Sequence, residues 1–510
     1  MSTSQPFRII SKPGIKRDGT LFEGDEYKDG LWCRFSRRGL PTKMGGYSAI
    51  TSQLPQIVRG MDCYYSGGVI YTHVGSESFL QQAQQNVSGI GGALTDRTPA
   101  GFAANVNNLW QFDEFYNTAT GQTCIVANAG ENLGDITNVV ETPIYYGPIT
   151  TQAQLTATGM PNVAGGLVAI DPYLIGYSIN GRVDVSEINE IQTGITYGSA
   201  FVSSEKIVKG LPLRNGTGGP AAILWSLCDL VVMTYNPSLL AGIPFNFTTV
   251  SGDVSVLSSQ GIVEFDGIYY WAEVDHFSMF NGVVLELPNN LNHDWFFANL
   301  NFSQRQKVFA VKIQQWGEIW WCYPSGNSTE CNAAIIFNVY LNTWYDTSLP
   351  DSGRSCGASP RAWNKVYFTD LDETTTGYTF WQHETGTDQV IGGVSRPIRS
   401  YIKTTEISPV IGTPAAKDKA YRVDVIEPDF GNVGPLTITV YGRANAQGVQ
   451  EAYESTTINQ PPQTGQDALA VVKENARLLA FQIESNCPGG TFYLGNAIAH
   501  IEPTDGRMTQ

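Results

Sequence analysis

The chain has 510 residues and a formal net charge of −16, with 15% charged and 42% hydrophobic residues. This balance excludes a disordered chain and a coiled coil, and the acidic excess argues against a protein that wraps nucleic acid by neutralising phosphates. The 53 glycines and 26 prolines, together with 11 Trp, 24 Tyr and 23 Phe, favour short strands joined by tight turns, so we expect an all-β fold.

Charge is distributed unevenly along the chain. Residues 1–60 hold 10 Lys or Arg and 5 Asp or Glu, whereas residues 61–300 hold 5 and 21. A basic N-terminal segment therefore precedes an acidic body. Two interpretations are open: an ordinary solvated segment, or an arm that docks on an acidic neighbour.

Nothing in the sequence predicts export or membrane insertion. The first residues, Met1 to Arg8, lack the basic cluster and apolar core of a secretory signal. The longest apolar stretch, Ala221 to Met233, contains Ser226 and Asp229 and is too short to span a bilayer. We expect no membrane span, and we expect the eight cysteines to be reduced thiols because they show no CxxC pair or zinc-type spacing.

In chain order, several stretches follow one pattern: an apolar β-rich run, a turn of Gly or Asn, and a second run. The first examples are 69–74 with 78–80, 123–127 with a turn at 128–130 and a run at 144–146, 173–177 with 182–185, and 222–225 with 230–235. The pair Asn180-Gly181 is a strong hairpin signal, because both central residues of such a turn must tolerate positive φ.

The clearest unit has four runs, at 261–265, 268–272, 276–280 and 283–287. The next has runs at 307–312, 318–323, 333–337 and 343–345, and a weaker seventh unit lies around 362–368 and 378–381. Four-stranded units that recur every roughly 40 to 50 residues are typical of a β-propeller. We predict a propeller of six or seven blades over residues 51–403; two or three β-sandwiches are the alternative architecture.

The pattern changes after Arg396-Pro397. Runs at 421–426, 436–441, 478–483 and 491–494 are separated by Gly, Pro, Asn and Gln, and several alternate apolar and polar positions as half-buried strands do. They predict a C-terminal β-sandwich over residues 404–510, with a linker at 411–416. Residues 1–50 are expected to form an N-terminal β arm.

A search for chemistry finds no phosphate-binding loop, nucleophile elbow, zinc-protease motif or dinucleotide fingerprint. Propeller hydrolases need paired carboxylates, and the candidates here are Glu264, Asp266, Glu273 and Asp275, with His276 adjacent. Asp266 lies in a predicted turn, where an acid needs no catalytic role. We therefore assign no catalytic residue and do not expect an enzyme.

Two further motifs contain residue types that occur in binding sites. Asp370-Leu-Asp372-Glu373 begins like a calcium loop, but Trp381 stands where the bidentate glutamate should fall, so we expect an acidic turn and no metal or cofactor site. The basic segment Arg34 to Arg38 contains an aromatic residue between cations. Packing within an N-terminal hairpin, contact with another subunit and binding of single-stranded nucleic acid are its three interpretations.

The stretch from Asp29 to Tyr47 resembles the N-terminal segment of tail proteins from short-tailed bacteriophages, in which the pattern x-R-F-x-x-G-x-P-x-K-x-G-G-aromatic leads into a propeller. The residues that correspond to this pattern are Arg34, Phe35, Gly39, Pro41, Lys43, Gly45, Gly46 and Tyr47, with one more residue between Phe35 and Gly39 than the pattern has. The unit Tyr270 to Gly282 is similar to a blade of the same family, and the end of the chain, Gly495 to Arg507, resembles its terminal sandwich.

The resemblance implies a structural virion protein, a hub or nozzle subunit of the phage tail that is made in the host cytoplasm. Six copies would form a ring beneath the portal and head-to-tail adaptor, contact tail fibre, spike or needle proteins, and enclose the channel through which genomic DNA leaves. An acidic body suits this role, because each phosphate neutralised by a basic side chain would retard the DNA.

A ring of identical subunits needs heterologous contacts, in which one patch meets a different patch of the neighbour. We therefore expect Arg34, Arg37, Arg38 and Lys43 of the basic segment to contact the acidic body of an adjacent copy. Two other functions are open: a propeller that binds or cleaves glycans on a phage or bacterial surface, and a propeller scaffold unrelated to viruses.

Overall fold

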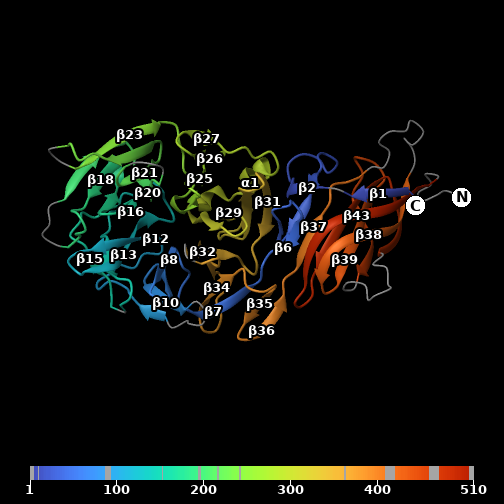
Figure 1. The fold of residues 1–510 in the computed structure, drawn as a ribbon, viewed down its shortest axis with the longest axis horizontal. Helices are drawn as coiled ribbons and strands as arrows, with labels where there is room; N and C mark the ends of the chain where they lie inside the picture. Colours follow the sequence, from blue (N-terminus) through green and yellow to red (C-terminus); the bar gives the residue numbers. More distant parts are fainter. Residues whose placement is uncertain are drawn as a thin grey trace.

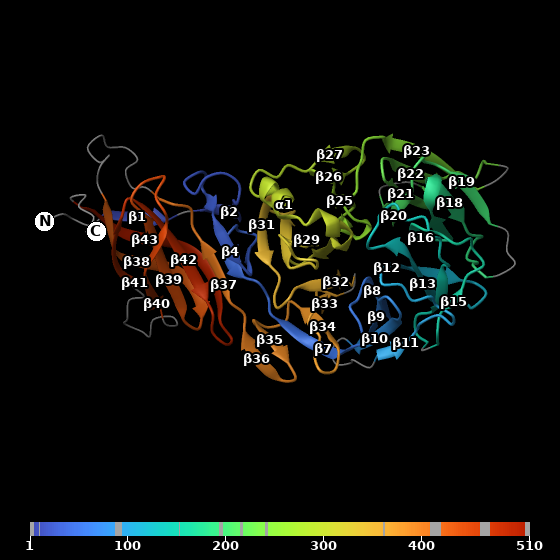
Figure 2. The ribbon, with the colours of Figure 1, turned by 180° about the vertical axis from the view of Figure 1, so that it is seen from behind.

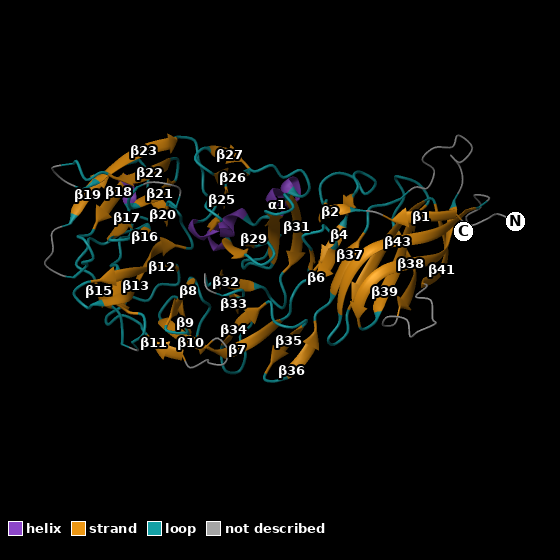
Figure 3. Ribbon diagram, viewed as in Figure 1, coloured by secondary structure: helices purple, strands orange, loops and turns teal. Residues whose placement is uncertain are grey.

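The computed structural model describes residues 5–9, 11–86, 94–151, 153–192, 197–214, 218–239, 243–360, 363–407, 420–458 and 470–504. Strands account for 55% and helices for 4%, so the predicted all-β class is confirmed. Figure 3 shows strands throughout the molecule and only short helical segments. Within the described part of the chain, no helix is long and apolar enough to cross a membrane.

Six antiparallel sheets of four strands follow one another in the described chain, each built from consecutive strands. The first three comprise β8 (Met61–Ser66), β9 (Val69–Gly75), β10 (Leu80–Asn86), β11 (Leu94–Asp96); β12 (Asn108–Asn117), β13 (Gln122–Asn132), β14 (Tyr145–Pro148), β15 (Thr156–Ala157); and β16 (Gly166–Ile170), β17 (Tyr173–Tyr177), β18 (Arg182–Val185), β19 (Gly198–Phe201).

The next three sheets complete the series. They comprise β20 (Ile207–Pro212), β21 (Ala221–Ser226), β22 (Leu230–Tyr235), β23 (Phe245–Ser251); β24 (Ile262–Phe265), β25 (Ile268–Ala272), β26 (Phe277–Phe280), β27 (Val284–Glu286); and β28 (Phe309–Ile313), β29 (Glu318–Tyr323), β30 (Ala333–Asn338), β31 (Thr343–Ser348). Asp266 (φ 50°) and Gly267 (φ 83°) form the tight turn between β24 and β25, as the Asp-Gly pair predicts.

The seventh sheet combines strands from distant parts of the sequence. It contains β32 (Arg354–Ala358), β33 (Val366–Asp370) and β34 (Tyr378–His383), and β7 (Tyr47–Leu54) pairs antiparallel with β34 as the fourth strand. A hairpin of β35 (Asp388–Ile391) and β36 (Val394–Pro397) extends the sheet beyond β7. The weak seventh unit of the sequence is thus completed by residues more than 300 positions away.

Neighbouring sheets contact one another through their first strands. Contacts join β8 to β12, β12 to β16, β16 to β20, β24 to β28, β28 to β32, and β32 back to β8, while β20 contacts the short helix η2 (Ser259–Gly261) that leads into β24. Apolar residues fill the spaces between sheets: Trp225 on β21 meets Trp271 on β25 edge-on, with ring centroids 5.8 Å apart. We call these seven sheets the seven-sheet body.

Apart from β2 (Lys12–Ile15) and β3 (Glu26–Tyr27), the remaining strands form two facing sheets, the two-sheet body, beside the seven-sheet body (Figure 1). Its C-terminal strands are β37 (Ser400–Lys403), β38 (Tyr421–Val433), β39 (Leu436–Arg443), β40 (Glu451–Ile458), β41 (Ala470–Ala476), β42 (Leu478–Ser485) and β43 (Thr491–Pro503). The predicted linker at 411–416 lies outside the described residues. β1 (Gln5–Ile9) and β43 lie in the part of the molecule remote from the seven-sheet body (Figure 1).

The N-terminal segment does not stand apart as an arm. β1 (Gln5–Ile9) and β6 (Pro41–Lys43) pair with β43, β5 (Cys33–Phe35) pairs with β6, and β4 (Asp29–Leu31) pairs with β37. Strands this short need a larger sheet to be stable. The two-sheet body therefore contains residues from both the N-terminal and the C-terminal part of the chain. It also contains β37, although the sequence predicts that the propeller extends to residue 403.

The N-terminal segment also bridges the two bodies. β2 (Lys12–Ile15) pairs in parallel with β3 (Glu26–Tyr27), and β31 of the sixth sheet contacts both β2 and β4. Figure 2 shows β31, β2, β4 and β37 in succession across the junction. The α-helix α1 (His293–Asn299) lies on the sixth-sheet side of this junction, where Asp18 accepts hydrogen bonds from the amides of Asp294 and Trp295.

Candidate functional site

Arg34 on β5 is the centre of a buried ionic cluster at the junction. Its side chain is fully buried, its Nε lies 2.9 Å from Glu318 Oε1, and its two terminal nitrogens donate to Glu384 at 2.7 and 2.8 Å. Glu318 also accepts from Tyr345 Oη at 2.6 Å. Burial opposes the charge on Arg34, but the two glutamates raise its pKa, whereas burial raises the pKa of Glu318.

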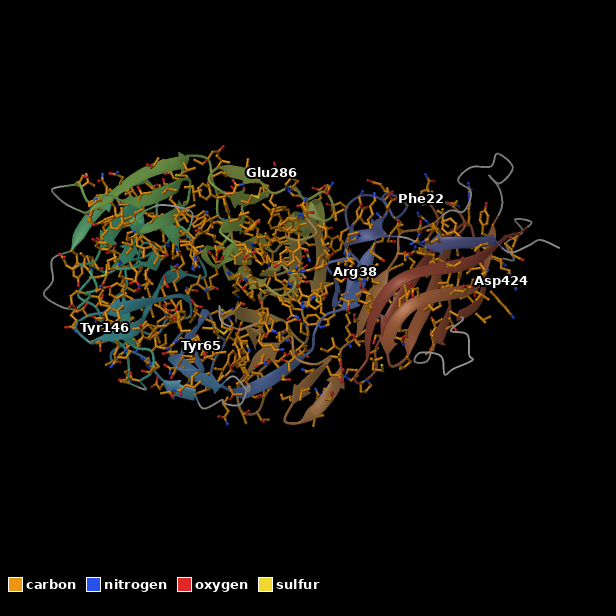
Figure 4. All side chains as sticks on the ribbon, in the orientation of Figure 1. Phe22, Arg38, Tyr65, Tyr146, Glu286 and Asp424 are labelled. Atoms are coloured by element: carbon orange, nitrogen blue, oxygen red, sulfur yellow. The ribbon has the colours of Figure 1, made fainter. Side chains whose placement is uncertain are left out.

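The other three residues of the predicted subunit contact have different environments. Lys43 is 5% exposed and donates to the carbonyl of Gly490 at 2.8 Å. Arg37 and Arg38 are exposed, and the Arg37 guanidinium stacks 4.4 Å from the ring centroid of Tyr340. Figure 4 labels Arg38 at the junction of the two bodies. Arg34 and Lys43 are therefore used inside the chain, and only Arg37 and Arg38 face solvent.

Two basic residues of the N-terminal segment form ion pairs with acidic residues of their own chain, whereas we expected such contacts between adjacent copies. Arg17 reaches Asp346 on β31 at 3.0 Å and Asp29 at 2.5 Å, and Arg34 reaches Glu318 and Glu384. Both arginines belong to the basic segment, and their partners Asp346, Glu318 and Glu384 belong to the seven-sheet body. The charge asymmetry of the sequence thus ties the N-terminal segment to its own chain.

A central cavity of about 390 Å³ lies where the first strands of the sheets converge. Six first strands line it: β8, β12, β20, β24, β28 and β32. Charged residues of five of these strands line it, namely Asp62, Asp113, Glu114, Lys209, Glu264 and Lys312, and Arg214 after β20 lines it as well. Tyr65 at the end of β8 lines the cavity and is 50% exposed (Figure 4). The cavity is therefore open to solvent and offers both donors and acceptors.

The charges in the central cavity are balanced by one another. Lys312 Nζ lies 3.2 Å from Glu264 Oε2, and the amide of Gly267 donates to Glu264 Oε1 at 2.7 Å. Burial opposes ionisation of Glu264, but Lys312 and this amide lower its pKa. Burial lowers the pKa of Lys209, and the carboxylates of Asp62 and Asp113 act against that shift.

Gln260 in η2 bridges sheets that are not neighbours. Its side-chain amide donates to the carbonyls of Arg59, just before β8, and Trp110 on β12, at 3.3 and 3.2 Å.

A second cavity of about 520 Å³ is lined by residues that include Arg59, Glu77 and Lys307. Arg59 and Lys307 both pair with Glu330, at 2.7 and 2.6 Å.

The carboxylates singled out from the sequence fall in three places. Glu264 lines the central cavity and Asp266 lies in a hairpin turn. Glu273 is 3% exposed and accepts from the amide and hydroxyl of Ser255, and the half-buried His276 lies 3.5 Å from Glu273 and 2.7 Å from Asp275. Among the described residues, no group of three or more His, Cys, Asp or Glu is arranged to hold a metal ion.

The acidic turn near residue 370 has a structural explanation. Asp370 accepts hydrogen bonds from the amide of Thr379 at 2.8 Å and from the indole of Trp381 at 3.0 Å. Asp372 accepts from the amide of Ser352 at 3.0 Å.

All eight cysteines are unpaired thiols, and six of them are buried.

No model of a known protein family matches the chain, and no curated protein matches it either.

Among the charged residues that line the central cavity, only Glu264 was a candidate from the sequence. These charged residues lie in five different units, so no local motif unites them. One signal was available for three of them: Lys209, Glu264 and Lys312 each stand beside apolar residues of a first strand, as in Ile207-Val-Lys209 and Phe309-Ala-Val-Lys312. Such a residue faces the converging strands because successive side chains alternate between the two faces of a strand.

Proposed function

We propose that the seven-sheet body is a closed seven-bladed β-propeller. The contacts between first strands support this, because they run through the sheets in chain order and return from β32 to β8. The pairing of β7 with β34 supports it further, since a blade completed by an N-terminal strand ties the start of the ring to its end. The four strands of β32, β33, β34 and β7 then match the strand number of the other six sheets.

The chain is a structural subunit of a short-tailed phage tail, the hub or nozzle. The observation that carries this proposal is that the residues of the tail-protein pattern build the junction of the two bodies. Arg34 forms the buried ionic cluster, and Tyr47 stacks on His383 with ring centroids 4.8 Å apart. A Cβ on Gly45 or Gly46 would lie within 3 Å of Glu384 or Asp388. The pattern thus encodes a fixed angle between propeller and sandwich.

In this function the genome passes between copies of the chain. The central cavity is too small for a DNA duplex to pass through it. It has a volume of about 390 Å³, and Gln260 bridges the strands beside it. The major groove of a duplex alone is about 12 Å wide. A six-fold ring of copies, joined by heterologous contacts, encloses the wider channel. Its partners are the head-to-tail adaptor and the fibre, spike or needle proteins of the virion tail.

Electron microscopy of the assembled particle tests this function. Full-length protein is purified alone and then mixed with the portal–adaptor complex of the same virus, and each sample is examined by light scattering after size exclusion and by microscopy. The expected result is a six-fold ring below the adaptor with an open central channel. A chain that never joins the adaptor and is absent from the tail density of purified virions contradicts the proposal.

A further inference from the structure

We propose that the central cavity binds a short, uncharged saccharide. The site lies on the first strands of six sheets, remote from β1 and β43 and from the junction residues, so the inference does not depend on the role in a tail. At about 390 Å³ it falls in the range of roughly 300 to 1,000 Å³ typical of small-ligand sites.

The cavity is preformed. Its walls are β-strands whose backbones are held by antiparallel pairing, such as the five paired positions of β28 with β29 and the four of β24 with β25. Three exposed residues, Tyr65, Glu114 and Arg214, line it, so it can be reached from solvent there. A ligand would therefore bind without ordering a flexible segment, which is the main cost of binding to a loop.

The charge pattern favours a neutral ligand with many hydroxyl groups. Glu264 is paired with Lys312, and Lys209 lies in the field of Asp62 and Asp113, so neither sign dominates the cavity. Ammonium groups are donors only and carboxylates are acceptors only, whereas a hydroxyl donates and accepts at once. A polyol or sugar matches such alternating partners, while a phosphate or a dication would meet a like charge beside each opposite one.

The uncharged part of the lining complements the other face of a sugar. Tyr65, with half of its surface exposed, offers a flat aromatic surface at the entrance, and Leu211, Val263 and Ala358 are apolar wall residues. A tyrosine ring provides contact area on its face and a polar group at its tip, which suits a ligand with C–H groups on one side and hydroxyls at its rim. The set of side chains therefore favours one or two sugar rings over a long chain.

Calorimetric titration of the full-length protein tests the inference. The probes are glucose, galactose, N-acetylglucosamine, maltose and lactose, with inorganic phosphate and putrescine as charged alternatives. We expect saturable binding of at least one sugar in a one-to-one ratio. Lys209→Met, which keeps the aliphatic stem and removes the ammonium donor, is expected to weaken that binding at least tenfold. Arg396→Met, an exposed change on β36, is the matched control and should leave it unchanged.

A second variant guards against loss of fold. Ser359→Trp retains every charge and fills the cavity with an indole, so it should abolish sugar binding even if Lys209→Met does not fold. Thermal unfolding of each variant confirms that the compared proteins are native. The inference is overturned if none of the five sugars binds, if sugar binding survives both variants, or if phosphate or putrescine is the only probe that binds.

Discussion

The side-chain amide of Gln260, in η2 just before the fifth sheet, donates to the backbone carbonyl of Trp110 on β12 of the second sheet, 3.2 Å away. A second bond from the same amide reaches the carbonyl of Arg59 at 3.3 Å. One side chain thus joins three sheets across the centre of the seven-sheet body. This link fixes the positions of first strands that have no direct pairing with one another.

Replacing Gln260 by Ala is expected to destabilise the protein by about 1–3 kcal/mol, because the carbonyl of Trp110 loses this donor, whereas that of Arg59 keeps the amide of Trp110 at 2.9 Å. Urea unfolding followed by tryptophan fluorescence measures the change as a lower midpoint with an unchanged slope. Gln447→Ala, an exposed change in the two-sheet body, is the control and should shift the midpoint little. Equal midpoints for the two variants would show that the bridge contributes nothing.

Arg34→Met is expected to cost about 3–5 kcal/mol, because Glu318 and Glu384 are left as buried charges without this cation. Exposed Arg38→Met is the control and should change the free energy of unfolding by less than about 0.5 kcal/mol. Both are measured by urea unfolding. A small effect of Arg34→Met would contradict the role of this cluster in holding the junction, since the change removes both ion pairs at once.

Gly46→Ala tests how tightly the residue before β7 is held against the start of β35. A Cβ at this position would lie 2.4 Å from the carbonyl oxygen of Asp388 and 2.5 Å from its nitrogen. The backbone must move to accept it, at a cost of about 1–3 kcal/mol, and we expect a lower melting temperature. Gly252→Ala is the control, because its nearest neighbouring atom would lie 3.7 Å away. Similar melting temperatures for the two variants would argue against this close approach.

Local sequence patterns predicted the strands better than the turns. The runs 173–177, 182–185, 230–235, 268–272 and 318–323 coincide with β17, β18, β22, β25 and β29. The turn expected at 128–130 was wrong, because β13 continues to Asn132. Asn128 there donates to the carbonyl of Pro143, and a Cβ on Gly130 would lie 2.5 Å from the carbonyl of Val163. Asn and Gly are typical of turns, but here close packing inside a strand requires the same two residue types.

Long-range pairing and the candidate site lay beyond the sequence. β7 pairs with β34, and β4 pairs with β37, across more than 300 positions, and no local periodicity records such partners. The resemblance singled out Arg34 and Lys43, but it could not distinguish a buried cation from an exposed one. The charged residues of the central cavity come from five units, so its composition becomes visible only when the strands are brought together.

Exposed Arg37 and Arg38 remain the predicted contact with a neighbouring copy. Changing both to Glu is expected to reduce ring formation with the adaptor, because it replaces two cations by two anions opposite an acidic surface. The melting temperature of the isolated chain should change little, since the Arg37–Tyr340 contact is a surface cation–π pair worth about 0.5–1 kcal/mol. Sedimentation velocity of the mixture measures assembly. Normal rings from the double variant would remove these residues from the interface.

Glu131 makes stability depend on pH in a defined direction. It is buried and paired with Lys206 at 2.7 Å, and burial raises its pKa from 4.5 to about 7. Between these values the folded state binds a proton that the unfolded state has released, so stability falls as pH rises from about 4.5 to 7 and levels off above. One pKa unit corresponds to about 1.4 kcal/mol, so the shift from 4.5 to about 7 sets an upper bound of about 3.5 kcal/mol for the change.

Glu131→Gln removes this titration while keeping the shape of the side chain. Urea unfolding at pH 5, 6, 7 and 8 is therefore expected to show a shallower decline for the variant than for the native chain, with the difference confined to the interval below about pH 7. Exposed Glu286→Gln on β27 (Figure 4) is the matched control and should reproduce the native slope. Parallel curves for native chain and Glu131→Gln would mean that this carboxyl is ionised throughout, with Lys206 holding its charge against burial.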